Sequence, residues 1–426
     1  MTNSASRSDS MERGGREPGR PDLVTRAQLI LLARTLHVPA ERLTHLNRLG
    51  AAQLHDLQQR MARVIFDEHA ATFKRLSMLV PIIPLSISIP LVQRIVPPMM
   101  GGRAAGAVGV VHPKKAAEAV GMLNPKYAAD CAPHIDPHTV GQLAVVAPPE
   151  PIVRIANELM RRKDYVTIGP LLAYATTPLI RAIEAGVPDD AGLIMSAAYA
   201  YSAPNISAIV RQLLTGPLDR IPGILETILA GSTELRLAAI SAFARCDEDV
   251  IEALGDVLFE IGAPEAVTDL ATTLIADGAI DDMLRFTAAL SPSALDTLAA
   301  NPITADRAAM SALVAAVAYV TDPVLWRGLL ALVERTDVEV RRRTSAQLIE
   351  LPEPTLAALP LIATKGRLWS PLLRVLAATD ADTQVRLGEL WAKLPAEERT
   401  DIERHARDLG LFTQLASLTV TLDIYG

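Results

Sequence analysis

The sequence predicts an all-α protein, an α-solenoid in which a superhelix of short, proline-led helices is followed by repeated helix pairs. Half of the 426 residues are hydrophobic but only 4% are aromatic, so Ala, Leu, Ile and Val carry the apolar content, a composition that favours helices over strands. Prolines recur every twelve residues at 113, 125, 137 and 149. Farther along, the segments 234–254 and 339–359 align without a gap.

The N-terminal part divides into a tail and a helical region. Residues 1–22 are rich in Ser, Gly, Arg and Glu and lack the apolar core of a secretory signal, so we expect a disordered tail. Residues 23–75 predict two or three helices. An apolar stripe there favours a helix packed on the first turns of the solenoid, and a helix for self-association or a partner is the alternative. The stripe comprises Leu54, Leu57, Met61, Val64 and Ile65.

Residues 76–100 form an apolar, proline-rich connector. No charged residue occurs from Leu76 to Gln93, which is about the length of a membrane span. Prolines at 81, 84 and 90 would break a spanning helix, so we expect an irregular segment buried in the core. The alternative is a surface that docks on a membrane or binds an apolar ligand. Its candidate contact residues are Ile82, Ile83, Leu85, Ile87, Ile89 and Leu91.

The twelve-residue spacing predicts five short helices over 101–160. The fourth, seventh, eighth and eleventh positions of each block are apolar, which is one stripe of an α-helix. Proline suits the first position of a helix and forces the preceding residue out of the α region, so each block is one helix of about two turns. Helices that short are not stable alone, so neighbouring blocks must bury each other's stripes.

This pattern resembles the cytoplasmic N-terminal superhelical domain of MgtE-type magnesium transporters, which is built from similar short helices led by proline. The resemblance covers about 100–160 well and extends more loosely to about 230. It implies a short-helix solenoid for residues 101–230, and it carries over no functional residue.

Residues 231–426 predict HEAT-like helical repeats. In the alignment of the two helix pairs, Arg236 meets Arg341 near the start of the first helix, where HEAT and armadillo units often carry an arginine. The final LTVTLDI alternates between apolar and polar residues, which predicts a short extended cap.

Reactive residues are few. Cys131, His134, Asp136 and His138 are residue types that suit zinc, but the repeat places Cys131 in a core column, and Pro137 prevents His134 and His138 from sharing a helix face. We therefore expect no metal and no cofactor. Phosphate-loop, nucleophile-elbow, HExxH and GxGxxG motifs are missing from the sequence, so we expect a protein that is not an enzyme.

Net charge and cysteine content narrow the possible partners and the cellular compartment. A net charge of −7 argues against a nucleic-acid partner, and two cysteines indicate a reducing compartment, so we expect a cytoplasmic protein. The sequence predicts a non-enzymatic helical-repeat scaffold or adaptor that binds a protein partner along an extended surface. The alternative is an apolar-ligand, lipid-binding or peripheral membrane protein that uses residues 76–100. The oligomeric state is left open.

Overall fold

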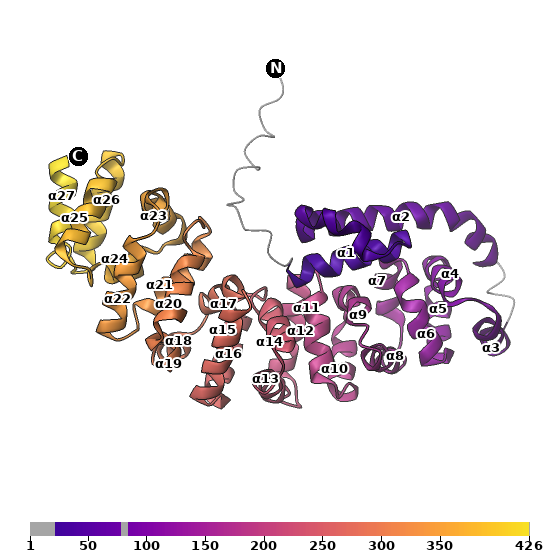
Figure 1. Cartoon of the computed structure of the whole chain (residues 1–426). Coiled ribbons are helices and arrows are strands. Elements are labelled where there is room, and N and C mark those ends of the chain that lie inside the picture. The colour runs from indigo at the N-terminus through magenta and orange to yellow at the C-terminus, as the bar shows by residue number, and fades with distance from the viewer. Residues whose placement is uncertain (1–21, 78–83, 426) are drawn as a thin grey trace, which may run out of the picture. The chain divides into compact units, whose positions relative to one another are not determined.

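The structure, a computed structural model, describes residues 22–77 and 84–425 (Figure 1). Within these ranges the chain consists of α-helices and short 3₁₀ helices joined by turns, and no strand is present, which confirms the all-α prediction. The contacts divide the chain into two compact units, one ending at Val250 and one starting at Ile251. This division falls inside helix α15 (Glu248–Ile261), beyond the boundary expected at 230.

The first unit begins with α1 (Leu23–Leu36), the 3₁₀ helix η1 (Ala40–Leu49) and α2 (Gly50–Ser77), as predicted. Asp22, which we expected in the tail, instead caps α1, because its carboxylate accepts a hydrogen bond from the Thr25 N–H at 2.8 Å. Leu54 is fully buried against the side chains of α1, while Val64 at the far end of the predicted stripe is 62% exposed. The remainder of the predicted tail, residues 1–21, lies outside the described residues.

The twelve-residue spacing is realised as predicted. Each of the four prolines is the first residue of a helix, where its missing N–H leaves no hydrogen bond unmade. The first helix of the series begins three residues earlier than expected, at the Pro98 that follows Pro97. The five helices are α4 (Pro98–Val111), α5 (Pro113–Met122), α6 (Pro125–Cys131), α7 (Pro137–Val146) and α8 (Pro149–Arg161).

Successive short helices alternate between two rows. In one row α4 contacts α6, α6 contacts α8, and α8 contacts α10; in the other α5 contacts α7, α7 contacts α9, and α9 contacts α11. This next-but-one packing buries the stripes of helices that could not be stable alone. The later members are α9 (Tyr165–Leu171), α10 (Thr177–Gly186), α11 (Asp190–Tyr199), α12 (Ala203–Thr215), α13 (Ile221–Leu229) and α14 (Thr233–Phe243).

Helices α1 and α2 lie across this series of short helices (Figure 1). Helix α1 contacts α9 and α11, and α2 contacts α1 and α4. The N-terminal region is therefore packed on the first turns of the solenoid, which is the arrangement favoured by its apolar stripe.

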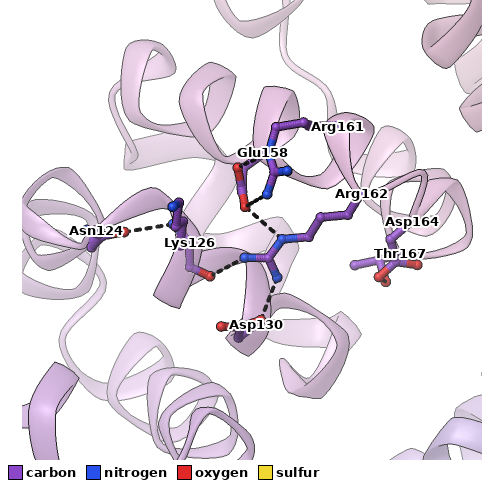
Figure 2. Close-up of polar contacts among 8 residues, drawn as sticks. All are labelled: Asn124, Lys126, Asp130, Glu158, Arg161, Arg162, Asp164 and Thr167. Atoms are coloured by element: carbon purple, nitrogen blue, oxygen red, sulfur yellow. Dashed lines mark hydrogen bonds and ion pairs between the residues drawn. The ribbon is translucent and has the colours of Figure 1, made fainter.

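Arginines tie one turn of the first unit to the next. The guanidinium of Arg162, at the end of α8, pairs with Asp130 of α6 at 2.5 Å and donates to the Lys126 carbonyl at 3.1 Å (Figure 2). It also bonds Glu158 at 2.8 Å, and hydrogen bonds from Arg161 and Arg162 lower the pKa of this carboxyl to about 2. Arg245 likewise donates to the Ala200 carbonyl at 2.6 Å. The Ala200 carbonyl lies just after the last residue of α11, so Arg245 satisfies a group that a helix end leaves unpaired.

Residues 84–95 correct one prediction. We expected an irregular, buried connector, but α3 (Leu85–Ile95) is a helix with Pro90 inside it. Pro90 has no N–H to donate to the carbonyl of Ser86, four residues earlier in the helix. Ser86 and Pro90 are both exposed, so water can donate to this carbonyl instead. Pro84 precedes the first helical residue, and the N–H groups of Ile87 and Ser88 bond its carbonyl. Residues 78–83 lie outside the described part of the chain.

The second unit repeats the two-row arrangement. Helix α20 contacts α22, α22 contacts α24, and α24 contacts α26, while α21, α23, α25 and α27 form the other row. Its helices after α15 are α16 (Pro264–Ala276), α17 (Ile280–Thr287), α18 (Pro292–Ala299), α19 (Pro302–Ala305), α20 (Arg307–Ala316), α21 (Pro323–Val333), α22 (Val338–Ile349), α23 (Glu353–Gly366), α24 (Trp369–Leu376), α25 (Ala381–Trp391), α26 (Ala396–Asp408) and α27 (Ala416–Tyr425).

The two aligned segments are helix pairs, α14 with α15 and α22 with α23. Their matched arginines act alike: Arg236 donates to the Leu229 carbonyl at 2.7 Å, and Arg341 donates to the Thr336 carbonyl at 2.9 Å. Arg236 reaches back to the last residue of α13, and Arg341 reaches back to the turn before α22. The predicted strand at the C-terminus is wrong, because LTVTLDI lies in helix α27.

Candidate functional site

The first unit contains a cavity of about 560 Å³ between the N-terminal helices and the short-helix series. One wall comes from α1 and α2, and the other from α4, the 3₁₀ helix η2 (Ala132–His134), α9 and the 3₁₀ helix η3 (Leu172–Tyr174). Its size lies within the range of small-molecule pockets. The cavity exists only because α1 and α2 fold back over the solenoid.

Arg34 holds α1 to the solenoid at the edge of this cavity. Its guanidinium donates to the hydroxyl of Thr167 at 2.7 Å and pairs with Asp164 at 3.0 Å. Thr167 in turn donates to the other oxygen of Asp164 at 2.7 Å, so the three groups form a closed set of charge-assisted hydrogen bonds. Figure 2 shows Asp164 and Thr167 next to each other.

One end of the cavity is lined by basic side chains from three elements. Arg103 of α4 lies 2.9 Å from Nε2 of His37, the residue that ends α1 in a left-handed conformation. The rings of His37 and His134 are 6.5 Å apart. Burial lowers the pKa of His134, and the neighbouring groups His37, Arg103 and Arg34 lower it further. The field at this end is therefore positive.

The opposite part of the lining carries an aromatic stack and buried amides. His55 of α2 stacks on Tyr201 with ring centroids 4.0 Å apart and planes 9° from parallel. Nδ1 of His55 lies 3.0 Å from the Gln28 carbonyl oxygen, which only accepts, so Nδ1 carries the proton. Gln58 donates to the Thr35 hydroxyl at 3.2 Å, and both glutamines are almost fully buried. Apolar side chains such as Phe66 complete the surface.

The second feature is an apolar face on α3. Ile87, Leu91 and Ile95 recur every four residues and are 65%, 56% and 67% exposed. Of the other sequence candidates, Ile89 is buried, Leu85 is half-buried, and Ile82 and Ile83 lie outside the described residues. The structure thus divides the predicted contact set between the interior and the surface. We call Ile87, Leu91 and Ile95 the α3 face.

Hydrogen bonds position α3 against the solenoid. The side-chain oxygen of Gln93 accepts from the Asn124 N–H at 2.7 Å, and the Tyr127 hydroxyl donates to the Val96 carbonyl at 3.0 Å. Helix α3 also contacts α5. Its inner side is therefore held on α5 and the start of α6, which leaves the α3 face pointing away from the protein.

The residues weighed as zinc ligands do not gather into one site. Cys131 is buried in the interior, and burial raises the pKa of its thiol to about 11, so it is protonated at neutral pH. His134 and Asp136 instead line the cavity. Among the described residues no group of three or more His, Cys, Asp or Glu side chains is arranged to hold a metal ion, and the side chain of His138 lies outside that set.

The Cys131 position yields a first prediction. We expect Cys131→Asp to lower the free energy of unfolding by about 1–3 kcal/mol, because it buries a polar group without a partner. Cys131→Ala is expected to cost under about 1 kcal/mol, since alanine occupies the same position in two other blocks. Urea unfolding followed by circular dichroism compares the two variants. Equal stability of both would show that this position is not part of the core.

Comparisons with known proteins add little to this geometry. Neither a family model nor a curated protein matches the chain. A solved structure described as a "circular tandem repeat protein with novel repeat topology and enhanced subunit contact surfaces" aligns over 94% of this chain and 97% of its own, at 14% identity and a TM-score of 0.20. A TM-score that low carries nothing about this chain's function. The resemblance to the MgtE N-terminal domain stays a prediction.

The sequence did not identify the cavity residues as a set. Arg34 and His37 both lie at the end of α1, but Arg103 and His134 come from other helices, and no spacing in the chain links them to α1. Only His134 drew notice, as a candidate zinc ligand. The one available signal was the apolar stripe on α2, which predicted that this helix packs on the solenoid and so implied an interface there.

Proposed function

We propose that this chain is a non-enzymatic helical-repeat scaffold that binds a partner protein, and that the α3 face is one contact surface. The observation that supports the proposal is the single row of exposed apolar side chains on a helix whose other side is fixed by hydrogen bonds. Rows of this spacing receive an amphipathic helix from another protein. With two free cysteines, the cytoplasmic location expected from the sequence goes with this proposal.

Charge around the α3 face favours an acidic partner segment. Residues 84–129 contain five basic side chains and one acidic side chain, although the whole chain has a net charge of −7. Arg94 lies on α3, and Lys126 lies two residues after the Asn124 that bonds Gln93, so basic groups flank the apolar row. Both are exposed. Complementary charge of this kind steers association and selects partners.

Exposed methionines occur on the two helices that follow α3 in the chain. Met99 and Met100, at the start of α4, are 38% and 50% exposed, and Met122 at the end of α5 is 42% exposed. Methionine side chains are flexible and polarizable and recur at surfaces that adapt to a partner. A membrane-bound interfacial helix ordinarily carries a wide apolar face with aromatic residues, whereas α3 has a narrow row and no aromatic residue. Every helix in the described ranges is too short or too polar to cross a bilayer.

Site-specific photo-crosslinking tests this proposal. The photo-reactive residue p-benzoylphenylalanine replaces Leu91 in the full chain, and the control carries it at Val338, an apolar residue that is 75% exposed on α22. We expect Leu91 but not Val338 to crosslink another protein within an acidic amphipathic helix. A synthetic peptide of that helix should bind the purified chain roughly tenfold more tightly than it binds an Ile87→Ser, Leu91→Ser double variant.

Three outcomes would contradict the proposal. Crosslinks from Leu91 to lipid, together with flotation of the chain on phosphatidylserine vesicles but not on phosphatidylcholine vesicles, would indicate the membrane-docking alternative. Crosslinks to a second copy of the chain would make the α3 face a self-association surface. Equal labelling from Leu91 and Val338 would show that the α3 face is no more of a contact surface than the rest of the exterior.

A further inference from the structure

The cavity under α1 and α2 has the composition of a binding site for a charged small molecule, independently of the α3 face. Its volume of about 560 Å³ would enclose a ligand of several rings, and its lining combines apolar side chains with a few polar groups. If these polar groups served only to stabilise the fold, each charged group among them would be expected to have an oppositely charged partner within the protein. The contacts of Arg34 and Arg103 differ in this respect.

Arg34 is neutralised by the protein and Arg103 is not. Arg34 pairs with Asp164 at 3.0 Å, so its charge has a carboxylate partner. Arg103, in contrast, makes its recorded side-chain contact with His37 at 2.9 Å, and within the described residues no carboxylate pairs with it. A guanidinium only donates, so Nε2 of His37 accepts this bond and carries no proton. The cation is thus oriented by a neutral ring and left without a counter-charge.

The neighbouring groups reinforce this positive end. After burial, the groups that lower the pKa of His134 are His37, Arg103 and Arg34, and no acid raises it. Asp136 also lines the cavity, but it acts on Tyr174, whose pKa is raised by burial and then by this carboxylate. The uncompensated positive charge at this end of the cavity is therefore that of Arg103, which lies beside His37. A bound anion would supply the missing counter-charge there.

The other part of the lining suits an uncharged, planar body. Tyr201 and His55 form a flat stacked pair, and Phe66 and Ile65 add apolar surface from α2. Gln28 and Gln58 hold this part of the lining in place through their bonds to His55 and Thr35. We propose that this cavity binds a small organic anion, a carboxylate or phosphate monoester attached to an apolar planar body, with the anionic group on Arg103.

Isothermal titration calorimetry with simple probes tests the site in the full chain. Benzoate and phenyl phosphate represent the two anion chemistries, and benzamide is the uncharged analogue. We expect at least one anion to bind at low-millimolar concentration and benzamide to bind roughly tenfold more weakly, because a charge-assisted bond to a guanidinium is lost. The stronger of the two anions identifies the preferred head group. Failure of both anions to bind, or equal binding of benzamide, would overturn the proposal.

Three variants test whether the effect belongs to this cavity. Arg103→Gln should weaken the anion roughly tenfold and leave benzamide unchanged, whereas Arg181→Gln, an exposed arginine on α10 that does not line the cavity, should change neither. Ala62→Phe, which fills the cavity from α2, should abolish binding of every probe. Circular dichroism verifies that each variant is folded. An Arg103→Gln variant that is folded and binds the anion as well as the wild type would contradict the assignment.

Discussion

Trp391→Ala is expected to lower the free energy of unfolding of the second unit by about 3–5 kcal/mol, the range for removing a large buried aromatic side chain. Trp391 is the last residue of α25 and is completely buried. Its indole N–H donates to the Leu356 carbonyl of α23 at 2.9 Å. The variant therefore leaves a cavity and also removes the donor from a buried carbonyl, and both changes destabilise the same helix contact.

Tryptophan fluorescence during guanidinium unfolding measures this effect in one unit. All three tryptophans, Trp326, Trp369 and Trp391, lie after Ile251, so the signal reports on the second unit alone, and two remain in the variant. Trp391→Phe is the matched control: it retains most of the volume and loses the indole donor, so it should cost about 1–3 kcal/mol. If Trp391→Ala lowered the free energy of unfolding by less than about 1 kcal/mol, this ring would not be an important contact between α25 and α23.

Gly328→Ala is expected to destabilise the second unit by about 1–3 kcal/mol, although alanine is the better helix former. A Cβ atom at this position would lie 2.1 Å from the Leu284 carbonyl oxygen, so α21 would have to move away from α17. The obstructing atom belongs to the backbone of a neighbouring helix and cannot turn aside as a flexible side chain can. The same fluorescence assay measures the loss.

Gly223→Ala provides the matched control with the opposite expected sign. Gly223 lies in α13 and is exposed, and a Cβ atom there would meet nothing within 4 Å. We therefore expect a gain of about 0.5–1 kcal/mol for the first unit from helix propensity alone, measured by circular dichroism. The two substitutions are chemically identical. If both variants gained stability, the close approach of α17 and α21 would not be a feature of the folded protein.

Helix boundaries in this protein follow from local chemistry. Proline at 113, 125, 137 and 149 stops one helix and starts the next through sterics that involve only adjacent residues, so the spacing alone predicted α5 to α8. The all-α class followed from composition and periodicity in the same way. Arg236 and Arg341 could be matched in advance because each bonds a carbonyl nearby in the chain, seven residues earlier for Arg236 and five for Arg341.

Packing overrode the local pattern at the C-terminus. LTVTLDI alternates as a strand does, yet Leu415, Leu418 and Leu422 are spaced as one helical stripe and are almost fully buried, and α27 contacts α25. The hydroxyls of Thr419 and Thr421 bond carbonyls four residues earlier, which satisfies them within the helix. Propensity is a weak guide where a partner helix buries the alternative stripe.

The α3 face and the cavity were decided by tertiary structure. The sequence identified 76–100 as apolar, but hydrophobicity alone does not say whether Ile87 or Ile89 is the buried residue. The hydrogen bonds of Gln93 and Tyr127, which hold α3 on its neighbours, decide which of its sides is exposed. The cavity depends on α1 and α2 folding over the solenoid, which brings Arg34 and Arg103 to one side of it. The ends of helices depend on interactions between residues that are near one another in the chain. A site depends on contacts between distant residues, and the spacing of residues in a single sequence does not reveal those contacts.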